Sequence, residues 1–382
     1  MTATEPPLPR EAYLSWLEID LEAIRLNYRL MREQLRPDAA LFAVIKADAY
    51  GHGALPVAKT LLHENPEMLC VARVEEAVEL RDGGIDIPLL VLAPPFDAQA
   101  KVAVSHECAI VVCDPEHMRA MAVAARQQNT RARIHLKVDI GMGRLGALPQ
   151  DVPALLQQIA DTPELELEGV MSHFPCADAP PGSFTDNQAR HFGEIVEQVR
   201  TAGMSVRYFH TANSAAILDH PLAHFNAART GITLYGQYPG TEMERRLPLR
   251  PAMSMRTTVA FLKDVPAGTG LSYGHVYHTT RASRIAIVPL GYADGYPRHA
   301  TNRGEMLVHG QRVPQVGRVC MDHVLLDVTD VPNVKLGDVV TAIGMDVNQV
   351  ITAEELATRC DTIGYEITTR VGKRLPKFYS HG

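Results

Sequence analysis

Residues 41–53 read LFAVIKADAYGHG, and this stretch decides how the rest of the chain is interpreted. A strand-like apolar run, 41–45, passes directly into Lys46 and then into small residues that include Gly51 and Gly53. An open doubly wound sheet usually carries a GxGxxG turn after its first strand, and this stretch has none. We therefore expect a strand that ends in a lysine at the rim of a closed barrel.

Seven further apolar runs follow as far as about Gly236, separated by longer amphipathic stretches. The expected strands are 41–45, 68–72, 88–92, 109–113, 133–138, 165–171, 206–210 and 225–230, and the expected helices include 74–81, 115–128, 151–160 and 185–202. Short apolar runs that alternate with amphipathic helices are typical of parallel βα units. The pattern predicts a (β/α)8 TIM-type barrel, with an open doubly wound sheet as the competing fold.

The pattern changes after about Leu247, where LPLRP (247–251) is the expected hinge. Strand-like runs separated by Gly, Pro and Asp turns then predict a mostly β domain. Its expected strands are 253–262, 284–290, 305–308, 312–319, 323–328 and 338–343. We expect three parts: an N-terminal segment at 1–12, which could pack on the β domain, the barrel at 13–247 and the β domain at 248–382.

Composition excludes some classes of partner. The chain has 382 residues and a net charge of −7, and its basic residues are scattered, so we expect neither nucleic acid nor a membrane as partner. No apolar run reaches the roughly 20 residues of a membrane helix, and residues 1–10 lack the apolar core of a secretory signal. The six cysteines have no metal-ligand spacing. We expect reduced cysteines rather than disulfides, no metal site and a cytoplasmic location.

Lys46 is the first candidate for chemistry, because barrel enzymes gather their reactive groups at the C-terminal ends of the strands. A lone lysine at such a place is often only a solvated strand end. Here Tyr50 supplies a hydroxyl nearby, and Gly51 and Gly53 let the backbone approach a ligand closely. A lysine that is partly desolvated at a pocket mouth has a lowered pKa and can form an imine with a carbonyl compound.

Charged and small residues also follow the later strands. Lys137 should point into the barrel, where a buried ammonium needs an anionic partner. Arg144, flanked by glycines, is either solvated or a fixed fork for a carboxylate or phenolate. His173 follows the sixth strand, and Ser214 and Gly231 follow the last two, where they suit a phosphate. These residues predict a phosphate-bearing cofactor and an imine-forming lysine, but they do not define the reaction.

Several motifs, in the same order along the chain, resemble the alanine racemase family, whose members depend on pyridoxal phosphate. AVIKADAYGHG (43–53) is similar to the cofactor-lysine signature of that family. The other motifs are WLEIDL (16–21), KVDIGMGRLG (137–146), ARTGITLYG (228–236), LSYG (271–274), GYADGYPR (291–298) and VGRVCMD (316–322). The resemblance spans about 16–377 and implies an isomerase built from a barrel and a β domain.

The resemblance implies two-base racemisation of L-alanine and D-alanine, which supplies D-alanine for peptidoglycan. Lys46 would bind the cofactor covalently and act as one base, and Tyr273 from the partner subunit of a homodimer with shared active sites would be the other. The implied cofactor contacts are Tyr50, Ser214, Gly231 and Ile232 at the phosphate, Arg229 at the pyridine nitrogen, His173 at Arg229, and Arg144 at the phenolate. Arg144 and the Met321 amide would bind the substrate carboxylate, and Lys137 matches a lysine that is carbamylated in many members.

The reaction explains why two bases are needed, since a proton must leave one face of the α-carbon and return on the other. Arg229 also differs from the carboxylate that many pyridoxal enzymes place at the ring nitrogen. A protonated arginine should leave that nitrogen unprotonated and weaken electron withdrawal. Rapid reprotonation of the α-carbon should then limit side reactions such as transamination.

One position departs from the family. A tyrosine that often lines the substrate entrance corresponds here to Lys373, counted without gaps from Tyr365-Glu366. A serine racemase or a broad-specificity racemase on the same fold is therefore an alternative. A decarboxylase of the same architecture is disfavoured by the motifs around Tyr273 and Met321. A further alternative is a non-catalytic carrier of the cofactor. Such carriers consist of a single barrel, whereas this chain is expected to have a second domain, so this alternative is disfavoured.

Overall fold

The computed structural model describes residues 6–179 and 183–380, which form two compact units. Within this part of the chain, the barrel unit comprises 24–49 and 54–249, and the β unit comprises 6–23, 50–53 and 250–380. Residues 1–5 of the expected N-terminal segment lie outside the described residues. The chain changes unit between Leu249 and Arg250, inside the expected hinge.

Eight parallel strands close the barrel. They are β2 (Ala40–Val44), β3 (Leu69–Val71), β4 (Leu89–Val91), β5 (Ala109–Val112), β6 (Ala132–Lys137), β7 (Leu165–Met171), β8 (Tyr208–His210) and β9 (Ala227–Thr230). Strand β2 pairs with both β3 and β9, which closes the ring. Such strands are apolar on both faces, because helices cover the outside and packed side chains fill the inside. The predicted (β/α)8 barrel is confirmed, and the open sheet is excluded.

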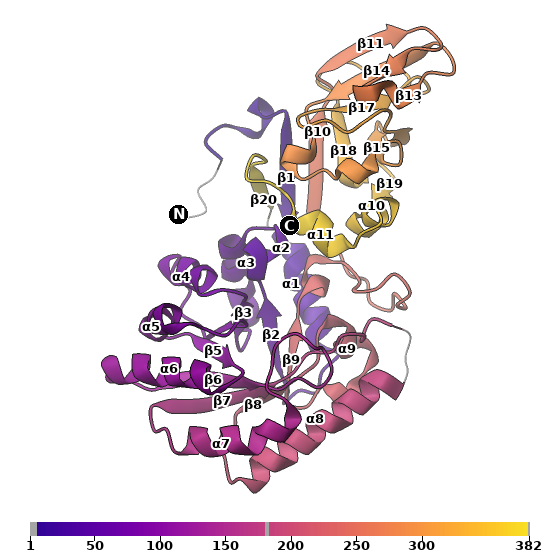
Figure 1. The fold of residues 1–382 in the computed structure, drawn as a ribbon. Helices are drawn as coiled ribbons and strands as arrows, with labels where there is room; N and C mark the ends of the chain where they lie inside the picture. The colour runs from indigo at the N-terminus through magenta and orange to yellow at the C-terminus, as the bar shows by residue number, and fades with distance from the viewer. Residues whose placement is uncertain (1–5, 180–182, 381–382) are drawn as a thin grey trace. The chain divides into compact units, whose positions relative to one another are not determined.

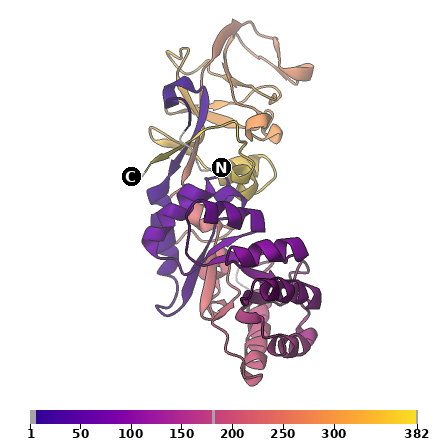
Figure 2. The same ribbon diagram turned by 90° about the vertical axis from the view of Figure 1, so that its left-hand side faces the viewer.

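Helices alternate with these strands and lie outside them (Figures 1 and 2). They are α1 (Leu21–Arg32), α3 (Ala54–Leu61), α4 (Val74–Asp82), α5 (Asp97–Ser105), α6 (Pro115–Gln127), α7 (Val152–Ala160), α8 (Ser183–Thr201) and α9 (Ser214–Asp219). Local chemistry starts α6, where the Asp114 carboxylate accepts a 2.9 Å hydrogen bond from the His117 amide. Pro115 takes the first helical position, where no backbone N–H is needed.

The β unit is built on a seven-stranded sheet in the order β16-β15-β18-β10-β1-β20, with β19 paired to β18. These strands are β1 (Ser15–Asp20), β10 (Met253–Thr258), β15 (Glu305–Val308), β16 (Gln311–Pro314), β18 (Val339–Asp346), β19 (Gln349–Ile351) and β20 (Lys377–Ser380). The other strands are β11 (Phe261–Val265), β14 (Ser283–Val288) and β17 (Val324–Asp327) in one sheet, and β12 (Gly270–Leu271) and β13 (Tyr277–His278) as a pair. Two helices, α10 (Ala353–Arg359) and α11 (Gly364–Thr369), follow β19.

The start of the chain differs from the expected division. Residues 13–23 belong to the β unit and not to the barrel, and residues 6–12 belong to the same unit. Strand β1 is the reason, since Leu17 pairs with Met255 of β10 and with Lys377 of β20. The backbone hydrogen bonds of β1 are therefore satisfied in that sheet.

The single strand expected at 253–262 is two strands in different sheets, β10 and β11. The backbone changes partner between them. The Val259 amide donates to the Asp338 carbonyl next to β18, at 2.9 Å. The following amide, of Ala260, donates to Ile287 of β14 at 3.0 Å. An apolar run does not reveal such a change, because both halves satisfy the strand pattern.

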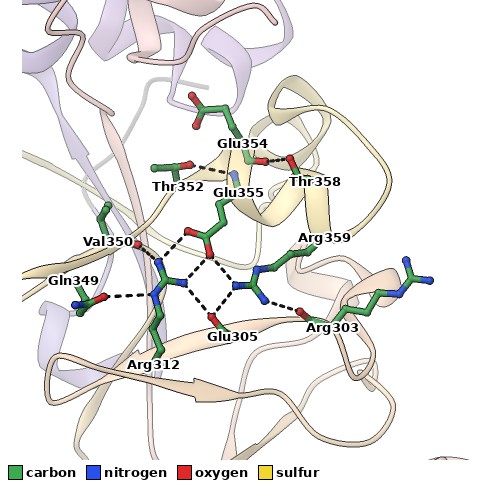
Figure 3. Close-up of polar contacts among 10 residues, drawn as sticks. All are labelled: Arg303, Glu305, Arg312, Gln349, Val350, Thr352, Glu354, Glu355, Thr358 and Arg359. Atoms are coloured by element: carbon green, nitrogen blue, oxygen red, sulfur yellow. Dashed lines mark hydrogen bonds and ion pairs between the residues drawn. The ribbon is translucent and has the colours of Figure 1, made fainter. Parts of the chain in front are cut away.

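Four charged side chains join α10 to the seven-stranded sheet (Figure 3). Glu355 on α10 accepts hydrogen bonds from Arg312 of β16 at 2.6 and 3.0 Å and from Arg359 at 3.1 Å. Glu305 of β15 accepts from the same two arginines at 3.0 and 2.8 Å. Burial raises the pKa of Glu355, but the hydrogen bonds from both arginines outweigh burial and hold the pKa below its usual 4.5.

We expect Glu355→Gln to lower the free energy of unfolding of the β unit by about 1–2 kcal/mol at pH 7, because two arginines lose a shared charged partner. A carboxylate with a depressed folded-state pKa stabilises fully above its unfolded pKa and loses that effect as the pH falls through the folded pKa. The difference between wild type and variant should therefore shrink in acid. Urea unfolding at pH 7 and at several lower pH values measures it.

The control is Asp330→Asn, which removes the partner of Arg281 in an exposed pair. An isolated surface ion pair contributes little, so we expect no measurable change in the free energy of unfolding. Equal effects of the two substitutions at pH 7 would show that the network adds nothing beyond a surface pair.

Candidate active site

The chain leaves β2 through a left-handed turn, α2 (Lys46–Tyr50). The three residues after the lysine have φ values of 53°, 54° and 52°. This conformation costs a non-glycine residue on the order of 1 kcal/mol or more, so surrounding contacts must hold it. The Ala47 amide donates to Glu76 of α4 at 2.5 Å, and the Asp48 carboxylate accepts from the Ala54 amide at 2.8 Å. The turn that follows the candidate lysine is thus strained and supported on both sides.

The environment of Lys46 favours its neutral form. Burial lowers the pKa of Lys46, and the positive charges of Arg144 and Arg229 lower it further. The Glu76 carboxylate opposes this shift only in part. Since the neutral amine is the form that bonds to a carbonyl carbon, Lys46 is suited to hold a carbonyl compound covalently.

Arg229, on β9, is a cation that is only 4% exposed. Its Nη1 donates to Nδ1 of His210 at 2.8 Å and to the His210 carbonyl at 2.9 Å. Its Nη2 donates to the carbonyls of Ser172 and Thr211, at 2.8 and 3.2 Å, and to Nδ1 of His173 at 3.3 Å. The Nε–H of Arg229 has no acceptor among the described residues. One donor of a rigidly held guanidinium is therefore left for a ligand.

Lys137, at the end of β6, is a second buried cation, 4% exposed. Burial, with the charges of Arg229 and Arg144, lowers the pKa of Lys137 to about 8. In the described part of the chain no carboxylate forms an ion pair with Lys137 or Arg229. The anionic partner that the sequence led us to expect for Lys137 is therefore not supplied by these residues, and the site suits an anionic ligand or modification.

Arg144 lies in a loop that Asp139 shapes. The Asp139 carboxylate accepts hydrogen bonds of 2.8–2.9 Å from the amides of residues 141–143. Burial raises the pKa of Asp139, but these amides outweigh burial and hold the pKa below its usual value. Gly146 has a φ of +133°, and a Cβ there would lie 2.6 Å from the Asp139 nitrogen, so no other residue fits. Arg144 itself is exposed and available to a ligand.

Buried hydroxyl groups cluster at the ends of β8 and β9. Ser214 Oγ accepts from the Gly231 amide at 2.9 Å and from Thr233 Oγ1 at 3.0 Å. Because Ser214 accepts two hydrogen bonds, its own hydroxyl hydrogen remains to be donated. Ile232 follows directly and is also buried. Hydroxyls and backbone amides gathered at strand ends suit a phosphate group.

Three expected site residues belong to the β unit. Tyr50 is buried, whereas Tyr273 is 72% exposed and Met321 is 52% exposed. Ser272, at φ +61°, precedes Tyr273 and donates its hydroxyl hydrogen to the Arg318 carbonyl at 2.7 Å. This bond ties the turn that carries Tyr273 to the segment that carries Met321.

The expected residues thus divide between the units. The barrel unit brings a group of them to the C-terminal ends of its strands: Lys46, Lys137, Arg144, His173, Ser214, Arg229, Gly231 and Ile232. Sequence reasoning missed Glu76, which supports the left-handed turn, and His210, which binds Arg229. The sequence did carry a signal of polar side chains inside the barrel, because Arg133, His135 and Lys137 occupy alternate positions and so lie on the same face of one strand.

Other features bear on function. Among the described residues no helix is long and apolar enough to cross a membrane. No group of three or more His, Cys, Asp or Glu side chains in this part of the chain is arranged to hold a metal ion. All six cysteines are free.

Comparison with known proteins covers almost the whole chain. The model of the alanine racemase N-terminal domain matches residues 19–239, and that of the C-terminal domain matches 252–379. The chain is 41% identical over 368 residues to an alanine racemase of Syntrophobacter fumaroxidans, which covers 96% of this chain and 98% of the relative. An alanine racemase of Methanococcus maripaludis is 40% identical with the same coverage.

Solved structures agree with the sequence comparison. The alanine racemase of Streptomyces coelicolor matches with a TM-score of 0.93 and 36% identity, covering 97% of this chain and 99% of that one. The enzyme of Bacillus anthracis, solved with bound L-Ala-P, matches with a TM-score of 0.91 and 38% identity, covering 99% and 97%. Motifs, barrel and β unit all agree with these relatives, and the chain belongs to the alanine racemase family.

Proposed function

We propose that the chain is a pyridoxal-phosphate-dependent isomerase that interconverts L-alanine and D-alanine, and so provides D-alanine for peptidoglycan. One observation carries the proposal: the unused Nε–H of buried Arg229 shares a barrel mouth with Lys46, whose pKa is lowered. The relatives that are named alanine racemases support alanine as the substrate.

The barrel residues fit the cofactor. They would be Lys46 in a covalent bond, Ser214, Gly231 and Ile232 at the phosphate, Arg229 at the ring nitrogen and Arg144 at the phenolate. Tyr50, which belongs to the β unit, would be a further contact of the phosphate. Burial and the charge of Arg229 lower the pKa of His173 well below its usual value, so a neutral His173 ring accepts from Arg229. When bound, the cofactor withdraws electrons from the substrate and makes its α-proton removable.

Two residues of the chain would move that proton. Lys46 acts on one face through its Nζ, and its lowered pKa increases the fraction in the neutral, proton-accepting form. Tyr273 of a second subunit would act on the other face. Its exposed position in the β unit leaves its hydroxyl available to another chain. Met321, also exposed, would bring its amide to the substrate carboxylate together with Arg144.

We further propose that Lys137 is carbamylated. Because burial lowers its pKa to about 8, roughly a tenth of Lys137 is a neutral amine at pH 7, far more than for an ordinary lysine. That amine can add to carbon dioxide, forming an N–C bond and releasing a proton, which leaves a carbamate anion. The anion would supply the missing negative partner and orient Arg144.

Lys373 supports a second candidate function on the same fold, a serine racemase or a broad-specificity racemase. It is exposed in the β unit where many family members carry a tyrosine that lines the substrate entrance. Initial rates with L-alanine and L-serine at equal concentrations distinguish the two. A faster rate with L-serine would favour this alternative.

The central test concerns Lys46. We expect the purified protein with pyridoxal phosphate to convert L-alanine into the racemate. The loss of optical rotation measures this conversion. Borohydride reduction and peptide mapping should then place the pyridoxyl group on Lys46, because this lysine combines a lowered pKa with its position at the end of β2, where the left-handed turn begins. Lys46→Ala should lose activity by at least about 10³-fold, as expected for a covalent catalytic group. A label on another lysine would overturn the assignment.

A second test concerns Lys137. Lys137→Ala should lower kcat/KM by about tenfold or more, because Arg144 loses its charge-assisted hydrogen bond to the carbamate. Millimolar acetate or propionate should restore part of the activity by replacing the carbamate. Lys59→Ala, at an exposed lysine of the barrel unit, is the control and should show neither effect. Full activity of Lys137→Ala without added carboxylate contradicts the proposal.

A third test concerns the shared site. Lys46→Ala and Tyr273→Phe should each be inactive alone and become active when their subunits exchange. Each mixed dimer would have one doubly defective site and one intact site, so its activity should approach about half that of the wild-type dimer. Exchange is verified with differently tagged subunits. If exchange is complete and no activity returns, each site is built within one chain.

A further inference from the structure

A row of buried polar side chains leads away from Arg229 inside the barrel unit, and the proposed chemistry does not use it. Nδ1 of His210 accepts from Arg229, and Nε2 of His210 lies 2.8 Å from Nδ1 of His135. Nε2 of His135 lies 3.2 Å from a carboxylate oxygen of Glu168. Both histidines are fully buried. We call His135 and His210 the histidine bridge.

The donors and acceptors allow one arrangement of hydrogens in the histidine bridge. Arginine can only donate, so Nδ1 of His210 must be the acceptor and Nε2 must carry the hydrogen. That hydrogen points at His135, whose Nδ1 must accept and whose Nε2–H must donate. The series ends at Glu168, because an ionised carboxylate only accepts. The bridge therefore has a direction, from the cation to the carboxylate.

The two rings of the histidine bridge are neutral, and the residues on either side of it, Arg229 and Glu168, are charged. Burial lowers the pKa of His210 well below its usual value, with a further contribution from Arg229. Burial also lowers the pKa of His135 and outweighs the opposing effect of Glu168. Burial raises the pKa of Glu168, but the His135 hydrogen bond and the charge of Arg133 outweigh it, so Glu168 stays ionised.

Local backbone features build this arrangement. The pairing of β6 with β7 shifts so that Ile134 faces Leu167 and His135 faces Gly169, which leaves Glu168 as the extra residue of a bulge. Bulges re-aim side chains, and this one belongs to a buried carboxylate. A Cβ at Gly169 would lie 2.3 Å from Nδ1 of His135, so the imidazole needs a glycine there. A bulge and a glycine thus support the same contact.

The far end of the row matters because Arg229 has no carboxylate next to it. Among the described residues, Glu168 is the one carboxylate that side-chain hydrogen bonds connect to Arg229, and they do so through the histidine bridge. A negative charge at the end of such a row polarises each bond in turn and makes Nδ1 of His210 a stronger acceptor. It also disfavours the opposite tautomers of the two rings. In those tautomers Nδ1 of His210 would carry a hydrogen and would face an N–H group of Arg229.

We propose that Glu168 is a remote positioning residue of the racemase site, which acts through His135 and His210 to hold Arg229 charged and oriented with its Nε–H toward the ligand. This inference rests on the proposed function for the identity of the ligand. The proton positions that it requires do not depend on that function and can be measured separately.

The first measurement is made on the wild-type protein loaded with pyridoxal phosphate. Solid-state NMR of protein labelled with 15N-histidine distinguishes the tautomers, and His135→Gln and His210→Gln samples assign the two resonance pairs. We expect both rings to be neutral with the hydrogen on Nε2. A hydrogen on Nδ1 of either ring, or a doubly protonated ring, overturns the proposal whether or not any variant folds.

The second measurement removes the charge. Glu168→Gln keeps an acceptor for His135, so the tautomers should persist while the Nδ1 resonance of His210 shifts and kcat/KM for L-alanine falls about tenfold. Glu168→Leu removes the acceptor as well and should give mixed tautomers and a larger loss. Glu166→Gln, at an exposed carboxylate on the same strand, is the control and should change neither quantity.

The outcomes separate the possible failures. Wild-type kinetics together with an unchanged His210 resonance in both Glu168 variants would show that Glu168 is only a packing residue. A loss of stability without a shift of that resonance in the folded protein would lead to the same conclusion. If the wild-type protein does not racemise alanine, the proposed function fails, and the tautomers still decide whether the histidine bridge has the direction described here.

Discussion

The barrel unit depends on keeping one guanidinium charged inside a protein interior. Burial lowers the pKa of Arg229 only to about 10, so the charge persists at neutral pH and its N–H groups must find acceptors. The carbonyls of Ser172 and Thr211 and the rings of His173 and His210 supply them, all at the ends of β7 and β8. These acceptors reach Arg229 only when the ends of β7, β8 and β9 lie side by side. Closure of the barrel therefore also shapes its mouth. Burial lowers the pKa values of the neighbouring lysines, and the charge of Arg229 lowers them further.

The mouth concentrates positive charge, and the structure manages this in two ways. Neutral imidazoles and carbonyl dipoles stabilise Arg229 without a neighbouring carboxylate, which would otherwise compete with an anionic ligand. The lysines respond by giving up protons more readily, so that Lys46 gains nucleophilic character and Lys137 becomes open to modification. The left-handed turn after Lys46 then fixes the direction in which the chain leaves β2. The lowered pKa and the strained turn therefore both act on Lys46.

The barrel could be predicted from sequence because each buried parallel strand is a continuous apolar run, and the helix between two strands has its own period and caps. Strand β1 was assigned to the wrong unit, since its partners β10 and β20 are remote in sequence and its apolar pattern suits either place. Strands as short as β12 and β13 carry no periodic signal. Candidate site residues that belong to motifs, such as Lys46 and Arg229, were proposed from the sequence. Glu168 and His135 were not, because a carboxylate and a histidine are unremarkable alone and a bulge cannot be recognised before the register is known.

The pairing of β1 with β20 sets an order for synthesis. The barrel strands are contiguous between residues 40 and 230, so the barrel can close while the ribosome is still translating the β unit. Strand β1 emerges before all of them, but it must wait for β10 and then for Lys377–Ser380, which are made after the barrel is complete. During that interval β1, which carries Trp16, Leu17 and Ile19, has unpaired backbone groups on both edges, which is a hazard for aggregation. Residues 15–20 should therefore need protection from other chains until residues 377–380 have emerged.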